Sequence, residues 1–227
     1  MLSEADHKRI TAAIEAAEAG TSGEVFCVLA RDVSRYREVP LAWGAIAAFV
    51  IPPLMVLTGL HRLALANIFT SWTDDSVRAV EGLILRFVSA YTLVQVGLFL
   101  CVALIVSLPP VRRAMTPSSL KAHRVRQLAR HHFAASGARL SSTEPHVLIF
   151  ACWSDHRVEL VAHDAINRIV GEKPWNDAVA AVTEGMRAHR PGDGFVRAIE
   201  ICGAALAQHF PPKGAPKNQL PNTVLET

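Results

Sequence analysis

Apolar residues along this chain form two kinds of pattern, and the first kind is a long run without any charged residue. One run extends from Val39 to Leu60 and a second from Phe87 to Val111. A helix needs about 20 apolar residues to cross the hydrocarbon core of a bilayer. The pattern therefore predicts a two-helix transmembrane hairpin at 40–110, with spans at about 40–60 and 87–108. A buried core helix, the alternative, is more typical of runs of about 10–14 apolar residues.

The connection between the two spans is short and itself partly apolar. Residues 61–86 include Phe69 and Trp72 and then the acidic pair Asp74 and Asp75. This composition favours a segment along the membrane interface, followed by a second helix that starts near the acidic pair.

The second kind of pattern is typical of a water-soluble domain and comes first at the N-terminus. Ser3 and Asp6 have the spacing of a capping box, and apolar residues then recur at helical spacing until Gly20. This predicts a helix at 3–19. The continuous apolar run Glu24–Ala30 predicts a buried strand.

The soluble pattern resumes after Pro117, so we expect residues 1–39 and 111–212 to form one domain that the hairpin interrupts. The spacing predicts helices at 118–136, 164–170, 175–188 and 193–209, and strands at 146–153 and 157–162. Residues 213–227, in a tail that is proline-rich from Pro211, are predicted to be irregular. The predicted fold class is α/β.

The distribution of basic residues predicts the orientation of the hairpin. The formal net charge is +3, and Lys and Arg residues near the membrane are concentrated outside the hairpin connection. Cytoplasmic flanks carry such an excess, which places both termini in the cytoplasm. The basic residues outside the connection are Arg31, Arg35, Arg37, Arg112, Arg113, Lys121, Arg124, Arg126 and Arg130, against Arg62, Arg78 and Arg86 within it.

The spacing of the cysteines bears on disulfides, zinc sites and the redox compartment. The four cysteines are far apart and show no C-x-x-C pairing, so neither a disulfide framework nor a zinc site is indicated, which agrees with a reducing compartment.

The basic segment lacks interleaved aromatic residues and a binding motif, which argues against nucleic acid as a partner. Anionic lipid head groups are the expected partner for the basic residues beside the membrane, Arg112, Arg113, Lys121 and Arg124.

The densest polar group in the soluble part lies around the second predicted strand pair. Asp155, Glu159, His163 and Asp164 could supply ligands to a divalent cation such as calcium. The alternative is an ordinary solvated turn with a cross-strand charge pair. Strand alternation places Glu159 and Val161 on one face of the sheet.

Three segments together resemble the TPM domain family, in a bacterial membrane-anchored branch. They are TSGEVFCVLA at 21–30, HVLIFACWSDHRVELVAHDAI at 146–166 and AIEICGAALAQHFPP at 198–212. The resemblance implies a small mixed sheet with helices on both faces. It also implies relatives that include a thylakoid-lumen acid phosphatase, and a divalent cation, apparently calcium, bound near acidic residues at strand ends in some members.

The chain departs from the family pattern where a carboxylate is expected. The family segment reads A-D-x-G-I, whereas this chain has Ala162, His163, Asp164, Ala165 and Ile166. Replacing a carboxylate by His163 weakens a site for calcium, which prefers oxygen ligands. A Gly-rich phosphate loop and a Ser-His-Asp order are also absent from the sequence.

These observations lead to three functional hypotheses. The first is a membrane-anchored, cytoplasm-facing interaction or assembly module for other membrane proteins in the bacterial inner membrane. The second is a divalent-cation-dependent phosphatase of the acid-phosphatase type, in which Asp155 and Asp164 take part. The third is a lipid-binding regulator that uses the basic segment at 112–130.

Overall fold

The chain folds into two compact units. The computed structural model describes all residues except 1, 34–35, 59–76, 138–144 and 213–219. Residues 1–35 and 118–227 form one unit, which we call the sheet unit. Residues 36–117 form the other, which we call the hairpin unit.

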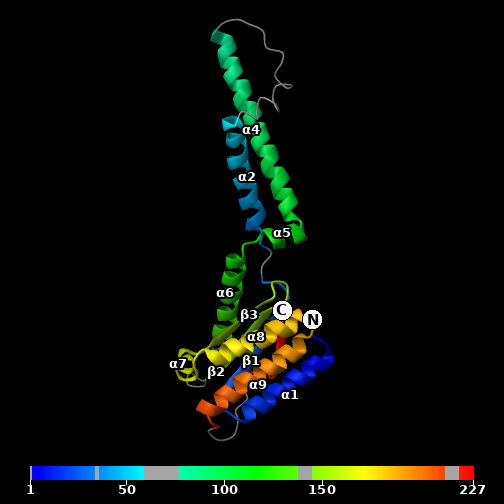
Figure 1. Cartoon of the computed structure of the whole chain (residues 1–227), viewed down its shortest axis with the longest axis vertical. Coiled ribbons are helices and arrows are strands. Elements are labelled where there is room, and N and C mark those ends of the chain that lie inside the picture. The colour runs from blue at the N-terminus through cyan, green and yellow to red at the C-terminus, as the bar shows by residue number, and fades with distance from the viewer. Residues whose placement is uncertain (1, 34–35, 59–76, 138–144, 213–219) are drawn as a thin grey trace. The chain divides into compact units, whose positions relative to one another are not determined.

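The sheet unit is built on a mixed sheet of four strands in the order β3-β2-β1-β4. The strands are β1 (Glu24–Ala30), β2 (His146–Cys152), β3 (Arg157–Ala162) and β4 (Val224–Glu226). β1 pairs in parallel with both β2 and β4, whereas β2 and β3 are antiparallel (Figure 1). The central strand β1 is therefore paired entirely with segments that come after the hairpin unit in the sequence.

The two central strands are continuous apolar runs because both of their faces are covered. Every residue of β1 and β2 is buried, as expected for strands with helices on each side. The prediction for β1 is confirmed residue for residue, and β2 ends one residue earlier than predicted. β3 also has its predicted bounds.

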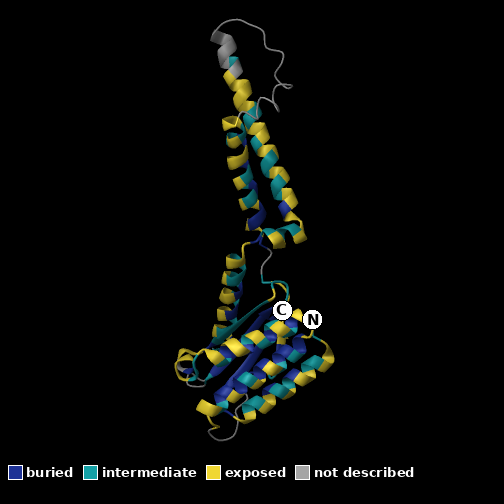
Figure 2. Ribbon diagram, viewed as in Figure 1, coloured by how far each residue is buried: buried dark blue, intermediate teal, exposed yellow. Residues whose placement is uncertain are grey.

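Helices cover both faces of this sheet (Figure 2). On one face α1 (Glu4–Ala19), α8 (Lys173–Arg187) and α9 (Pro191–His209) pack against Val25, Cys27 and Leu29 of β1. On the other face α6 (Ser118–Gly137) packs against Phe150 and Leu148 of β2. The mixed α/β fold class predicted from the sequence is confirmed.

The first helix begins as its sequence predicts. The Ser3 hydroxyl accepts a hydrogen bond from the Asp6 amide at 3.1 Å, and the Asp6 carboxylate accepts one from the Ser3 amide at 3.1 Å. The Ser3 hydroxyl also donates to the Asp6 carboxylate at 2.7 Å, and this hydrogen bond, followed by the one from the Ser3 amide, lowers the pKa of Asp6 below its usual value. The capping box is therefore formed.

The C-terminal tail differs from the prediction. Residues 213–219 lie outside the described part, but Leu220 and Val224 are buried, and 224–226 form β4. The chain end is held further by a hydrogen bond from the Arg31 amide to the Thr227 carbonyl at 2.7 Å. The prediction of an irregular tail was wrong at this point because a three-residue strand is stabilised by distant β1, not by local sequence.

The hairpin unit contains α2 (Glu38–Leu57), α4 (Val77–Ser107) and the short α5 (Pro109–Met115). α2 and the 84–107 part of α4 are long and apolar enough to cross a membrane. A Cβ atom at Gly44, near the start of α2, would lie 3.0 Å from the carbonyl oxygen of Phe99, near the end of α4. The two helices, which run in opposite directions (Figure 1), are therefore closely packed at that point.

The connection between the helices is described only in part. Residues 59–76 of the predicted interfacial segment lie outside the described residues. From Val77 onward the chain is in α4, so the helix predicted to start near Asp74 and Asp75 continues without a break into the predicted span at 87. The sequence did not indicate α5, whose two prolines occupy its first positions, where a proline needs no amide partner.

Candidate functional site: a pocket between α6, β3 and α7

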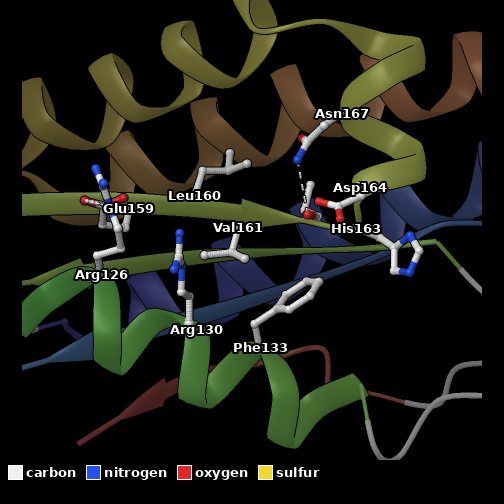
Figure 3. Close-up of a pocket in the computed structure, with 10 residues that line it drawn as sticks. Arg126, Arg130, Phe133, Glu159, Leu160, Val161, His163, Asp164 and Asn167 are labelled. Atoms are coloured by element: carbon white, nitrogen blue, oxygen red, sulfur yellow. Dashed lines mark hydrogen bonds and ion pairs between the residues drawn. The ribbon is translucent and has the colours of Figure 1, made fainter. Parts of the chain in front are cut away.

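A pocket with a volume of about 450 Å³ lies beside the edge strand of the sheet. Its residues come from α6, from β3 and from α7 (Asp164–Val170). Figure 3 shows these residues as sticks. We call it the α6–β3 pocket; it is lined by Arg126, Arg130, Phe133, Glu159, Leu160, Val161, Ala162, His163, Asp164 and Asn167.

Helix α6 supplies the basic wall of the pocket. Val125 and Ala129 are fully buried against the sheet and anchor the helix. Arg126 and Arg130 each follow one of these anchors, so they lie one turn apart on the neighbouring face. The helix thereby presents two guanidinium groups to β3.

Phe133 continues this wall and is held in place from behind. Its ring stacks on the ring of His146 with centroids 4.2 Å apart. His146 is buried at the start of β2. Since one side of the Phe133 ring is packed on a buried residue, this part of the pocket wall is formed before any ligand arrives.

Strand β3 forms the floor of the pocket, and its alternation sorts its residues by face. Val161 packs with the α6 side of the sheet, whereas Val158 and Leu160 pack with the α1, α8 and α9 side. The pairing register places Glu159 opposite Phe150 and Val161 opposite Leu148, both of which face α6. Glu159 and Val161 therefore share a face, as the sequence predicts.

Helix α7 closes the far end of the pocket. It starts directly after β3, and the Asn167 side chain donates a hydrogen bond to the Ala162 carbonyl at 3.3 Å, which ties the helix to the end of the strand. Asp164 lies in its first turn. Figure 3 shows Asp164 and Arg126 toward opposite ends of the pocket, with Val161 and Phe133 between them.

The charges in the pocket are only partly paired with one another. Arg126 Nε lies 3.6 Å from Glu159 Oε1, in a pair whose arginine side chain is 59% exposed. Such an exposed pair contributes only about 0–1 kcal/mol. Among the residues that the structure describes, neither Arg130 nor Asp164 makes a hydrogen bond or an ion pair through its side chain.

Helix α6 also carries a histidine on its inner side. His132 lies over Phe150, with ring centroids 5.7 Å apart, and burial lowers its pKa, with a smaller contribution from neighbouring His131. The imidazole is therefore neutral at pH 7. Together with Phe133 it makes the inner face of α6 apolar and leaves the positive charge to the arginines.

The predicted metal ligands are only partly brought together. Glu159, His163 and Asp164 line the pocket. Asp155 lies in the turn before β3, 3.9 Å from the Cys152 thiol, and so at the opposite end of that strand from Asp164. Within the described part of the chain, no three His, Cys, Asp or Glu side chains form a group that could hold a metal ion.

The predicted lipid-binding residues are divided between the two units. Arg112 and Arg113 lie in the last turn of α5. Lys121 and Arg124 lie in α6, before the pocket arginines. Binding of lipid head groups by these four residues stays a prediction.

The sequence did not identify the pocket, although part of its signal was present. Arg126 and Arg130 were assigned to the basic segment beside the membrane, and Phe133 to the helical pattern. Arg126, Arg130 and Phe133 are separated by four and then three residues, so they share one face of α6, next to the face that carries Val125 and Ala129. Which strand this face meets depends on the tertiary fold and cannot be obtained from that spacing.

A second group of titratable side chains lies at the start of β1, outside the pocket. Glu18 accepts a hydrogen bond from the Val25 amide at 3.1 Å. Burial raises the pKa of Glu18 to about 7, partly opposed by that hydrogen bond and increased by the charges of Glu24 and Glu15. Glu24 is itself only 5% exposed.

The cysteines of the sheet unit behave as buried apolar residues. Burial raises the thiol pKa of Cys27 and Cys152, and that of Cys202 to about 12. All four cysteines are free, and Cys101 in α4 is exposed. Thiols with raised pKa values are poor nucleophiles, which agrees with a structural role for these three.

Comparison with known proteins supports the fold class alone. The α/β architecture is shared with the BA42 protein from the psychrophilic bacterium Bizionia argentinensis, whose structure was determined by NMR. The two structures agree with a TM-score of 0.54 and 18% sequence identity, over 100% of this chain and 96% of that one. No protein-family model and no curated protein matches the chain.

Proposed function

We propose that this chain is a TPM-domain protein of the bacterial inner membrane and acts as a cytoplasm-facing interaction or assembly module for other membrane proteins. In this proposal α2 and α4 cross the bilayer as a hairpin, both termini lie in the cytoplasm, and the sheet unit carries the binding surface. The TPM assignment rests on the three sequence segments quoted above.

The observation that carries the membrane part of the proposal is the exposure of the apolar side chains in the hairpin unit. Only 28% of the most apolar stretch of α2, and 0% of that of α4, is buried within the protein. Phe49, Leu93 and Leu104 are each more than 70% exposed. Exposed apolar surface of this extent is typical of helices that face lipid.

The α6–β3 pocket supports the interaction part of the proposal. It combines the guanidinium groups of Arg126 and Arg130 and the ring of Phe133 with an apolar floor, and arginine and aromatic residues are enriched where proteins bind one another. It also lies beside β3, the edge strand of the sheet, where extended segments of partner proteins often dock.

Topology can be tested with reporter fusions in a bacterial host. We expect a reporter that is active only in the cytoplasm to be active at both termini. A reporter that is active only in the periplasm is expected to be active when it is inserted in the connection at 61–76. Activity of the two termini on opposite sides of the membrane would refute the hairpin arrangement.

The interaction itself can be tested by site-specific photocrosslinking in native membranes. We expect a photoreactive residue at Val161, in the pocket, to capture one identified membrane protein, whereas the same residue at Thr11 on α1 does not. A capture that is equal at both positions, or absent at every surface position of the sheet unit, would contradict the proposal.

The phosphatase hypothesis predicts a different result. Purified protein in detergent would then hydrolyse a phosphate ester in a calcium- or magnesium-dependent manner, and Asp164→Asn would abolish the activity. Under our proposal we expect no turnover above that of a control preparation of Asp164→Asn. Cation-dependent turnover by the wild-type protein would favour the phosphatase.

A further inference from the structure

We infer that the α6–β3 pocket binds a carboxylate side chain on an extended segment of a partner protein, with Arg130 as its main contact. The inference rests on the proposed function, because it names the chemistry by which the interaction module would recognise its partner. It follows from the positions of the charges in the pocket and from the apolar surface between them.

Arg130 is the cationic group that is available to a ligand. Arg126, one turn earlier on α6, is already 3.6 Å from Glu159, whereas Arg130 makes no ion pair with any residue in the described ranges. A guanidinium group offers two parallel N–H donors that match the two oxygens of a carboxylate. The weak ion pair with Glu159 engages the guanidinium group of Arg126 and leaves that of Arg130 available to a ligand.

The carboxylates of the pocket argue for a singly charged ligand group. Glu159 and Asp164 line the same pocket as the two arginines, so their charges cancel those of Arg126 and Arg130. A phosphate group carries nearly two negative charges at pH 7 and would be repelled by both carboxylates. A single carboxylate on Arg130 carries about half that charge, so the repulsion is roughly halved.

The surface between Arg130 and Asp164 is apolar. Figure 3 shows Val161 and Phe133 between these two side chains. An extended segment would place an apolar side chain over them, and a lysine further along would reach Asp164. The predicted ligand is therefore a stretch in which an acidic residue is followed by apolar residues and then by a basic one.

The test is a peptide-binding titration with the full-length protein in lipid nanodiscs. The probes are fluorescent peptides, blocked at both ends, that contain one glutamate, then one, two or three leucines, then one lysine. Matched peptides replace the glutamate with glutamine or with phosphoserine. The protein variants are Arg130→Gln and, as a control of identical chemistry outside the pocket, Arg168→Gln on α7.

We expect at least one glutamate peptide to bind the wild-type protein and to lose about ten-fold in affinity when Arg130 is replaced by glutamine. The glutamine peptide should bind as weakly to the wild-type protein as the glutamate peptide does to Arg130→Gln, and Arg130→Gln should not weaken it further. Such non-additivity shows that the two changed groups contact each other. The Arg168→Gln variant should bind like the wild type.

Four results would overturn the inference: no glutamate peptide binds, glutamate and glutamine peptides bind equally, the phosphoserine peptide binds most tightly, or Arg130→Gln binds the glutamate peptides as the wild type does. The failure of the inference can be told apart from the failure of the proposed function. If photocrosslinking captures a partner but no peptide depends on Arg130, only the carboxylate inference fails. If no surface of the sheet unit captures a partner, the proposed function fails as well.

Discussion

Helices α9 and α4 are both rich in apolar residues, but these residues have opposite surroundings. In α9, Ile199, Cys202 and Leu206 are each 0% exposed because the sheet and α8 cover them. In α4, Leu93 is 72% exposed and Leu104 is 74% exposed. Apolar content alone therefore does not distinguish a core helix from one that faces lipid. The two are distinguished by whether other parts of the protein cover the apolar side chains.

The two units nevertheless join their helices in the same way. In the sheet unit, a Cβ atom at Gly185 of α8 would lie 2.7 Å from the Cα atom of Gly194 in α9. In the hairpin unit, Gly44 allows the same kind of close approach between α2 and α4. The helices of the two units therefore pack alike at these contacts and differ on their outer faces, where those of the hairpin unit expose large apolar side chains.

The largest expected effect is the removal of a buried aromatic residue from the sheet unit. Phe195 is 0% exposed, so Phe195→Ala should lower the free energy of unfolding by about 3–5 kcal/mol. The measurement is urea denaturation of the protein in mild detergent. Phe49→Ala is the matched control in α2, where the side chain is 73% exposed, and its expected change is below about 0.5 kcal/mol. Equal effects of the two substitutions would remove the contrast between the units.

A smaller effect is expected when the contact between α2 and α4 is overfilled. Gly44→Leu forces the helix backbones apart, since the new side chain would meet the Phe99 carbonyl, at a cost of about 1–3 kcal/mol. The loss can be followed as an earlier midpoint in a titration with SDS. Gly97→Leu on α4 is the control, because a Cβ atom there would have no heavy atom within 4 Å. A shift of the midpoint with Gly97→Leu but not with Gly44→Leu would show that the helices pack differently.

The smallest effect is a pH dependence that should belong to the sheet unit. The pKa of Glu18 is raised from 4.5 to about 7 in the folded protein, so its contribution to stability is complete below pH 4.5 and is lost as the pH rises through 7. Because the side chain is only partly buried, we expect a loss of about 1–2 kcal/mol. Glu18→Gln should flatten this part of the stability profile, and Glu184→Gln, at an exposed position on α8, should leave it unchanged. An unaltered profile in Glu18→Gln would assign the pH dependence to another group.

The elements that could be predicted from the sequence are those that are specified by residues within or directly beside them. β1 and β3 have their predicted bounds because an uninterrupted apolar run and an alternating one are each bordered by turn residues. The capping box at Ser3 and Asp6 set the start of α1 in the same way. β4 was missed because its three residues are stabilised by pairing with Cys27, Val28 and Leu29, which are very distant from them in the sequence.

The candidate site shows the same limit. Glu159, His163 and Asp164 were identified because they lie close together in the sequence, and the structure places them along one pocket. Arg130 and Phe133 were not assigned to it, since only the packing of α6 on β2 and β3 brings them there. Asp155 was included in the metal site because it is near in sequence, but the length of β3 separates it from Asp164.

The pairing of β1 has a consequence for the order in which this protein can be made. β1 precedes the hairpin unit in the sequence, whereas both of its neighbours, β2 and β4, are translated only after that unit. β4 lies at residues 224–226, far beyond the hairpin unit in the sequence. β1, in which every residue except Glu24 is apolar, must therefore remain without its partners while the hairpin unit is synthesised, and the sheet is complete only once β4 has been made. We expect the nascent chain to need a chaperone or early delivery to the membrane, a requirement that no folded-state contact reveals.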